Sequence, residues 1–172
     1  GEQIADIAAK CGIVGLGGAA FPTAVKLRTS GAEKKPDTLV VNGSECEPYL
    51  TCDDRVMVED AQAVMDGIAL AMKATGVSRA LIGIEDNKPE AIRSMEAAAK
   101  EGIQVVTLPT RYPQGYEKML IYALTGRSVP KGGLPCDVQC VVLNVATCAA
   151  LSAAVREGRP MIDRVVTVCG RV

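Results

Sequence analysis

Glycines are concentrated near the start of the chain, in the segment Gly15-Leu16-Gly17-Gly18-Ala19-Ala20. This segment matches the pattern G-x-G-x-x-A, in which glycines let backbone N–H groups approach a phosphate at the start of a helix. A dinucleotide-binding Rossmann loop also needs a strand directly before it, whereas the preceding residues have a helical pattern. We therefore expect a phosphate or flavin cradle of another kind, with a plain turn between two helices as the alternative. Lys26, about one helical turn beyond Pro22, would add a cation to a bound phosphate or would simply be solvated.

Carboxylates follow two apolar runs that have the composition of buried strands. Glu45 and Glu47 lie on the loop after residues 38–42, and Glu85 follows the next such run. Carboxylates on loops beyond the carboxyl ends of parallel strands can accept hydrogen bonds from ribose hydroxyls, a carboxamide or flavin ring nitrogens. Acidic surface loops without a ligand are also common, and near Glu85 the neighbouring Asn87 could merely cap a helix. The position at the sheet edge favours the ligand interpretation for Glu45 and Glu47.

An amide and a hydroxyl stand at the start of a later helix. Asn144 ends the apolar run 138–143, and Thr147 follows three residues further on. These groups could contact a ligand, but asparagine is also one of the preferred N-cap residues, so a plain helix cap is an equal alternative.

Composition excludes several classes of function for this chain of 172 residues. Histidine is absent, which excludes Ser-His-Asp and Cys-His catalytic centres, histidine zinc sites and histidine general bases. The 19 basic and 20 acidic side chains leave a formal net charge of −1, so there is no basic excess to hold phosphate backbones. Tryptophan is also absent, and one Phe and four Tyr are too few for the stacking platforms of single-strand binders. We expect no nucleic-acid partner.

Cysteine usage and hydropathy point to a reducing compartment. Seven cysteines without a CxxC motif favour neither a disulfide framework nor a zinc or iron–sulfur site within this segment. The most apolar stretch, residues 138–155, is interrupted by polar side chains and predicts a buried strand and helix rather than a membrane span. No signal peptide is visible. The chain begins without Met, and we expect it to be one domain cut from a longer polypeptide.

Strand and helix patterns alternate along the chain, which predicts an α/β fold. The expected helices cover residues 2–11, 55–74 (with a kink near Gly67), 87–100, 117–124 and 146–156. The expected strands cover residues 38–42, 80–84, 103–108, 138–143 and 164–169. Near-continuous Val, Ile and Leu runs indicate strands that are buried on both faces. We therefore predict a mainly parallel sheet of four to five strands flanked by helices on both faces, a variant of the Rossmann arrangement.

Five ordered strings carry a family resemblance: GIVGLGGAAFPTAVKL, VVNGSECEPYLTCDDR, LIGIEDNKPEAI, LPTRYPQGYEKMLIYALTG and VVLNVATCAA. Together they resemble the RnfC family, the peripheral NADH-oxidising subunits of bacterial ion-translocating electron transport complexes. More distantly, they are similar to the flavoprotein subunit of respiratory complex I, which binds FMN and NADH. The resemblance implies that residues 1–172 form a single FMN- and NADH-binding domain. In that family an SLBB domain and a region with two iron–sulfur clusters follow this domain.

The resemblance also implies roles for individual residues. The residues implied to hold the FMN phosphate and NADH are Gly15, Gly17, Gly18 and Lys26, with Phe21 beside the nucleotide. The residues implied to line the flavin and nicotinamide site are Asn42, Ser44, Glu45, Glu47, Glu85, Asn144 and Thr147. Glu45 and Glu47 would be the catalytic carboxylates, lowering the flavin potential by like-charge repulsion of the reduced ring. Four positions depart from the related patterns, namely Leu16, Ala20, Ala24 and Tyr116.

The implied function is electron transfer from NADH through FMN to iron–sulfur clusters outside this segment, with ferredoxin as an indirect partner. The domain would be cytoplasmic and peripheral on the inner face of the cell membrane, bound through other subunits of the complex and not inserted directly. One alternative is a non-catalytic docking domain that keeps the fold without flavin, which Ala20 and Tyr116 favour. Another is an RnfC-like protein related to cobalamin reductases or linked to proline reductase.

Overall fold

A four-stranded parallel sheet forms the centre of the molecule. The computed structural model describes residues 1–28 and 35–170. The strands lie in the order β3-β2-β1-β4 and comprise β1 (Thr38–Gly43), β2 (Arg79–Glu85), β3 (Ile103–Leu108) and β4 (Cys140–Asn144). Asn42 of β1 is in register with Gly83 of β2 and with Asn144 of β4, so these strands end at one common edge. The predicted parallel α/β sheet is confirmed.

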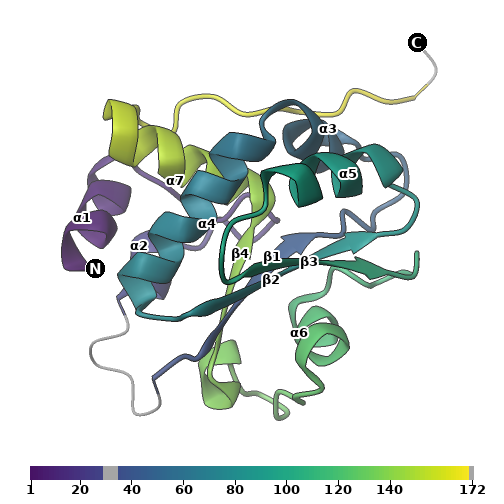
Figure 1. The fold of residues 1–172 in the computed structure, drawn as a ribbon, viewed down its shortest axis with the longest axis horizontal. Helices are drawn as coiled ribbons and strands as arrows, with labels where there is room; N and C mark the ends of the chain where they lie inside the picture. Colours follow the sequence, from purple (N-terminus) through teal and green to yellow (C-terminus); the bar gives the residue numbers. More distant parts are fainter. Residues whose placement is uncertain (29–34, 171–172) are drawn as a thin grey trace.

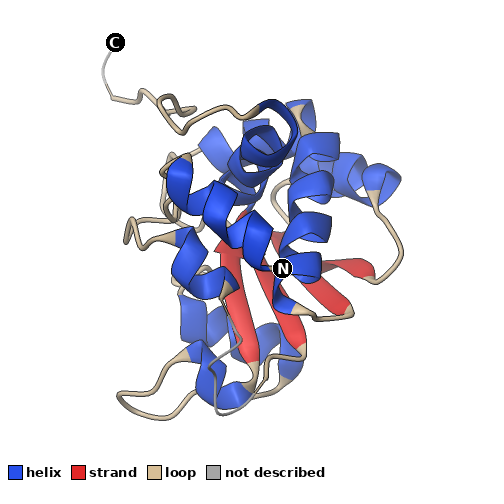
Figure 2. Ribbon diagram, turned by 90° about the vertical axis from the view of Figure 1, so that its left-hand side faces the viewer, coloured by secondary structure: helices blue, strands red, loops and turns tan. Residues whose placement is uncertain are grey.

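Helices cover both faces of this sheet unequally. The larger layer contains α1 (Glu2–Lys10), α2 (Thr23–Leu27), α3 (Cys52–Glu59), α4 (Ala61–Thr75), α5 (Pro89–Ala98) and α7 (Val145–Glu157). The opposite face carries α6 (Glu117–Thr125) and the short 3-10 helix η1 (Pro135–Val138). Figure 1 shows α6 below the sheet and the larger layer above it, and Figure 2 shows the strands side by side from the direction of α1.

Strand β1 shows why the apolar runs are continuous. Leu39 and Val41 belong to the core cluster under the larger helical layer, whereas Val40 belongs to the cluster under α6. Successive side chains of a strand point to opposite faces, so a strand that is covered on both sides needs an apolar residue at every position. No helix within the described residues is long and apolar enough to cross a membrane.

The structure corrects the predicted fifth strand at residues 164–169. This segment is extended but pairs with no strand, and Val166 and Val168 are exposed. It runs over α7 and α3, away from the sheet (Figure 1), and Thr167 Oγ1 accepts a hydrogen bond from the Thr51 N–H at 3.0 Å. A β-branched run becomes a strand only where a partner offers its backbone groups, and here the sheet edge is out of reach.

The expected helix at 55–74 is also corrected, because it is divided into α3 and α4 at Asp60. The division lies seven residues before Gly67, and α4 continues through that glycine. A Cβ at Gly67 would lie 1.8 Å from the Cys148 carbonyl oxygen, so the glycine permits close packing of α4 against α7. Asn87 does not cap α5, since Lys88 occupies the N-cap position without a side-chain cap.

Candidate functional site

A cavity of about 380 Å³ opens at the carboxyl ends of β1 and β4. Its walls are the glycine loop, the loop after β1 and the start of α6. The residues that line it include Gly15, Gly17, Phe21, Lys26, Asn42, Cys46, Glu47, Tyr112, Gly115, Tyr116, Glu117, Asn144 and Thr147. The volume is in the range of small-molecule and cofactor sites. The structure thus brings together eight of the twelve predicted site residues and leaves Gly18, Ser44, Glu45 and Glu85 outside the cavity wall.

The glycine loop, residues 15–21, connects α1 to α2. An antiparallel bridge between Val14 and Pro22 closes its base, and the Gly15 N–H donates to the Phe21 carbonyl at 2.9 Å. Helix α1 precedes the loop, so this is not the strand-turn-helix of a Rossmann fingerprint. The Leu16 N–H donates to Thr147 Oγ1 at 2.9 Å, which holds the loop against the start of α7.

Lys26 places a cation on the cavity wall beside the glycine loop. Its Nζ donates to the Val142 carbonyl at 3.0 Å and lies 3.6 Å from Glu117 Oε1. The same nitrogen lies 6.0 Å from the centre of the Phe21 ring. Because the Lys26 side chain is partly exposed, a phosphate in the cavity could replace these contacts with a charge-assisted hydrogen bond.

The two predicted catalytic carboxylates point to different places. Glu47 lines the cavity and is exposed. Glu45 is buried, has a φ of +46°, and turns its carboxylate to the start of α3. There it accepts hydrogen bonds from the Asp53 N–H at 2.8 Å and the Asp54 N–H at 3.0 Å. Glu45 therefore satisfies the unpaired N–H groups of a helix N-terminus, which differs from the expectation that it faces a flavin.

Asn42 and Ser44 shape the backbone beneath the cavity. Asn42 lines the cavity, donates from Nδ2 to the Gly115 carbonyl at 2.9 Å and accepts at Oδ1 from the Ser44 N–H at 3.1 Å. It thereby joins the loop after β1 to the loop before α6. The Ser44 side chain is fully buried, and its hydroxyl has no partner among the described residues.

Glu85 lies beneath the loop after β1 and not in the cavity. Its carboxylate is 3.7 Å from Lys88 Nζ in a buried ion pair, and it accepts from the Arg111 N–H at 3.3 Å. Lys88 Nζ also donates to the Ser44 carbonyl at 2.8 Å. The pair supports the backbone of the loop after β1, residues 44–51, which we call the acidic loop. This differs from the ligand role that the resemblance implies for Glu85.

The sequence left open whether Asn144 contacts a ligand or caps a helix, and its position in the structure fits both roles. It lines the cavity, and its Oδ1 caps α7 by accepting from the N–H groups of Ala146 at 2.9 Å and Thr147 at 3.3 Å. Its Nδ2 donates to Asp53 Oδ2 at 2.6 Å. Burial raises the pKa of Asp53 to about 6 against the opposing Asn144 hydrogen bond, with Glu45 adding to the increase.

A known family shares this fold and these motifs. The family described as the Nuo51 FMN-binding domain matches residues 8–153. The chain belongs to this family. It is 54% identical over 171 residues to a subunit of the proton-translocating ferredoxin:NAD(+) oxidoreductase complex of Clostridium ljungdahlii. It is 47% identical over 171 residues to the corresponding subunit of the Na(+)-translocating complex of Acetobacterium woodii. These matches confirm the predicted resemblance to the RnfC family.

The matches cover the chain and its relatives to different extents. Each of these two alignments includes 98% of this chain but only 37% and 38% of the respective relative. An NAD+-reducing [NiFe]-hydrogenase in its H2-reduced state aligns with a TM-score of 0.79 at 24% identity, over 91% of this chain and 31% of that one. This structural likeness shows that the aligned parts of the two chains share one fold.

The cavity residues fit the phosphate of an FMN. Among the described residues, nothing accepts a hydrogen bond from the Gly17 N–H, which is therefore free for an anion. A Cβ at Gly17 would lie 3.5 Å from the Asn144 Cβ and would fill space on the cavity wall. Lys26 and the positive end of the α7 dipole supply favourable charge nearby. The glycine loop thus has the space and the donors that a phosphate needs.

Several cavity residues were not predicted as site residues. Tyr112, Gly115 and Glu117 lie in or after the loop that follows β3, and Tyr116 was noted only as a departure from the family pattern. The strand pattern could have indicated these residues as site residues. Because β3 is parallel to β2, the loop after β3 must open at the same edge of the sheet. Tyr116 is 54% exposed and stands at the cavity wall without closing it.

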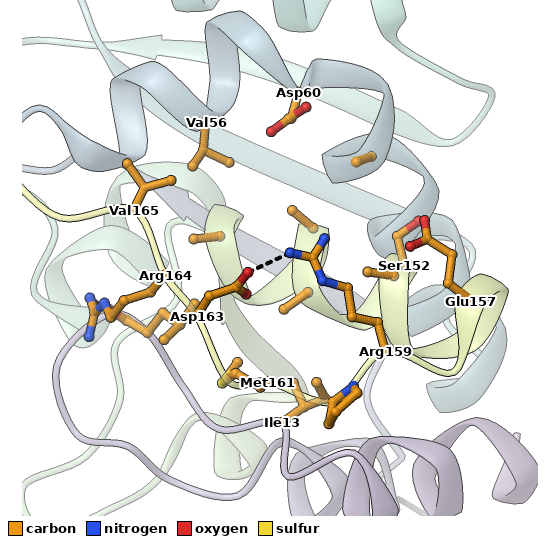
Figure 3. Close-up of a pocket in the computed structure, with 17 residues that line it drawn as sticks. Ile13, Val56, Asp60, Ser152, Glu157, Arg159, Met161, Asp163, Arg164 and Val165 are labelled. Atoms are coloured by element: carbon orange, nitrogen blue, oxygen red, sulfur yellow. Dashed lines mark hydrogen bonds and ion pairs between the residues drawn. The ribbon is translucent and has the colours of Figure 1, made fainter.

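A second cavity of about 280 Å³ lies between residues 159–165 and α7 (Figure 3). Its floor is formed by small side chains of α7 such as Ala149 and Ala153. Arg159 and Asp163 form an ion pair at 2.5 Å within it. The charged groups of Arg159 and Asp163 are thus occupied with each other.

Proposed function

We propose that this chain binds FMN in the larger cavity, with the phosphate toward the glycine loop and Lys26, and uses it to accept a hydride from NADH. The observation that carries the proposal is the convergence of a free Gly17 N–H, the Lys26 ammonium and the start of α7 on one cavity. The Nuo51 family membership supports the choice of FMN over other phosphate ligands.

Bound FMN would supply a ring that takes up a hydride and releases electrons one at a time. Gly15 and Gly17 would let the backbone approach the phosphate, and Lys26 would neutralise part of its charge. Glu47 is the carboxylate on the cavity wall, where it could accept hydrogen bonds from NADH hydroxyl or carboxamide groups. A negative charge near the flavin also disfavours an anionic reduced ring, which lowers its potential and suits delivery to low-potential acceptors.

The relatives' names support the wider setting of this proposal. Both relatives belong to complexes named as ion-translocating ferredoxin:NAD(+) oxidoreductases. We infer that this chain is the NADH-oxidising part of such a complex, peripheral on the cytoplasmic side of the membrane. Iron–sulfur clusters outside this segment would carry electrons onward, with ferredoxin as an indirect partner.

The test is a titration of the intact natural protein with FMN, followed by anaerobic addition of NADH. We expect bound-flavin absorbance and its bleaching by NADH. Lys26→Ala should weaken FMN binding about ten- to a hundredfold at low salt, since charge-assisted hydrogen bonds contribute roughly 1.5–3 kcal/mol. The loss should be smaller at high salt. Lys73→Ala, which removes an exposed lysine of α4, serves as the control.

Two results would contradict the proposal. If the parent protein binds no flavin under any condition, the domain is better interpreted as a docking module that retains the fold. If FMN binds equally well to the parent and to Lys26→Ala at low ionic strength, the phosphate does not lie beside Lys26.

A further inference from the structure

Asp53 lies at a junction between the segments that surround the nucleotide cavity, although it does not line the cavity itself. It is in the first turn of α3, where its N–H donates to Glu45 Oε1 at 2.8 Å. Its carboxylate accepts the Asn144 Nδ2 hydrogen bond at 2.6 Å. Asp53 therefore connects the acidic loop to the start of α7.

Asn144 extends this connection to the glycine loop. Because Asp53 accepts from Nδ2, the Asn144 Oδ1 must face the N–H groups of Ala146 and Thr147. Thr147 in turn accepts from the Leu16 N–H. A continuous chain of hydrogen bonds thus runs from Glu45 through Asp53, Asn144 and the first turn of α7 to the glycine loop.

Without an acceptor at position 53, the Asn144 amide is oriented only by the N–H groups of Ala146 and Thr147. A rotation by 180° would turn its NH2 group toward the N–H groups of α7 and leave the helix uncapped. The Thr147 hydroxyl and the glycine loop that it holds would then lose their fixed position. Both Asn144 and Thr147 line the cavity, so this change would reach a bound ligand directly.

We propose that Asp53 is a positioning residue that acts through Asn144 to hold the start of α7 and the glycine loop in place for FMN. The inference rests on the proposed function for its ligand, but the hydrogen-bonded chain can be tested without FMN. Asp53 does not line the cavity, which distinguishes it from the residues that would bind FMN themselves.

The surroundings of Asp53 make this link sensitive to pH. Glu45 and Glu47 of the acidic loop raise the pKa of Asp53 together with burial, and Arg164 of the C-terminal segment opposes them. Cys52 is its neighbour on α3, and burial together with the Glu45 hydrogen bond raises the pKa of that thiol, so it remains protonated. Below pH 6 Asp53 gains a proton, and the charged acceptor for Asn144 is lost.

The first measurement is the FMN dissociation constant of the intact natural protein between pH 5 and pH 7.5. With a pKa of about 6, the charged form of Asp53 falls from most of the population at pH 7 to a minor part at pH 5. Affinity should therefore fall roughly tenfold between these pH values if only the charged form holds the loops. The phosphate of FMN also titrates in this range, so the informative quantity is the difference between parent and variants.

Asp53→Asn keeps an oxygen that can accept from Asn144, whereas Asp53→Ala removes it. We expect Asp53→Ala to lose about tenfold in affinity at pH 7.5, Asp53→Asn to lose as much as the parent loses when Asp53 is protonated, and neither variant to show the Asp53-dependent part of the pH profile. Glu59→Gln makes the same charge change as Asp53→Asn at an exposed position of α3 and should retain the parent profile. If FMN affinity and its pH dependence are the same in the parent and both Asp53 variants, the inference is overturned.

The second measurement, hydrogen exchange of the FMN-free protein at pH 7.5, separates this inference from the proposed function. Peptides that cover residues 13–20 and 144–150 should exchange faster in Asp53→Ala than in the parent and in Glu59→Gln, while the core strands remain protected. Unchanged exchange in both peptides would overturn the inference whether or not FMN binds. Faster exchange in a protein that binds no FMN would support Asp53 as the link and would instead refute the proposed cofactor.

Discussion

Glu45 and Glu47 are two positions apart in the sequence but act on different parts of the molecule. Glu45 holds the N-terminus of α3, and Glu47 faces the cavity. In an extended segment, residues two positions apart point to the same side, and the left-handed backbone conformation of Glu45 interrupts that alternation. A pattern of alternate carboxylates therefore does not imply a pair of catalytic carboxylates.

We expect Glu45→Gln and Glu47→Gln to have opposite signatures. Glu45→Gln should reduce the free energy of unfolding by about 1–2 kcal/mol, since Gln keeps one acceptor but loses the charge that favours two helix N–H groups. Glu47→Gln should leave stability unchanged while raising the flavin midpoint potential and slowing reduction by NADH. Urea unfolding, spectroelectrochemical titration and single-turnover reduction provide these three measurements.

The same experiments would also reveal whether Glu45, and not only Glu47, faces the flavin. If Glu45→Gln shifts the flavin potential as much as Glu47→Gln does, while stability stays at the parent value, then Glu45 faces the ring when the cofactor is bound. An unaltered potential and rate in Glu47→Gln would remove Glu47 from the catalytic site.

At the level of elements, the close contact between α4 and α7 depends on Gly67 having no side chain. A Cβ at Gly67 would overlap the Cys148 carbonyl of α7, and the Cys148 side chain is itself fully buried. Burial raises the pKa of Cys148 to about 12, so this thiol packs as a neutral small group. Helix α7 begins at the cavity, and its packing therefore affects the site as well as the core.

We expect Gly67→Ala to destabilise the protein by at least about 1–3 kcal/mol, the usual cost of overpacking, even though alanine is the better helix former. Thermal and urea unfolding measure this loss. Gly17→Ala is the matched comparison, because its Cβ would meet Asn144 at an ordinary 3.5 Å and should leave the fold intact. A Gly67→Ala variant as stable as the parent would show that α4 and α7 can move apart without cost.

At the level of the whole molecule, one carboxylate joins helices that are far apart in the sequence. Asp66 of α4 is buried and binds Lys100, which follows α5, while its Oδ2 lies 2.6 Å from Arg156 of α7. Burial would raise the pKa of Asp66, but the hydrogen bonds from Lys100 and Gln62 outweigh it, so the pKa is lowered. This centre therefore stabilises the packing of the larger helical layer.

The lowered pKa of Asp66 predicts a pH-dependent contribution to stability. Its folded pKa lies below its unfolded pKa, so its contribution is complete above the unfolded value of about 4 and is lost as the pH falls through the folded value. Asp66→Asn should therefore cost roughly 1.5–3 kcal/mol at pH 7 and progressively less at lower pH. Urea unfolding of both proteins from pH 7 to pH 3 measures the difference. A difference that stays constant over this range would exclude Asp66 ionisation as its source.

The sequence alone was sufficient to predict the parallel sheet and much of the cavity. The strand at 103–108 and the cap at Asn144 depend on local properties, namely a run rich in β-branched residues and an amide before a helix. The glycine loop was predicted because glycine is needed wherever a backbone must approach a ligand. Such features follow from the preferences of a few consecutive residues.

Only the tertiary structure decided which polar groups face the cavity. Residues 164–169 have the composition of a strand, but no sheet edge lies beside them. Glu45 and Glu85 have the position of ligand-binding carboxylates, yet they contact a helix terminus and Lys88 and do not line the cavity. Asp53 had no predicted role until the fold placed it 2.6 Å from Asn144, 91 residues further along the chain. The physical reason is that a charged side chain turns to the nearest compensating group, and long-range packing determines which group that is.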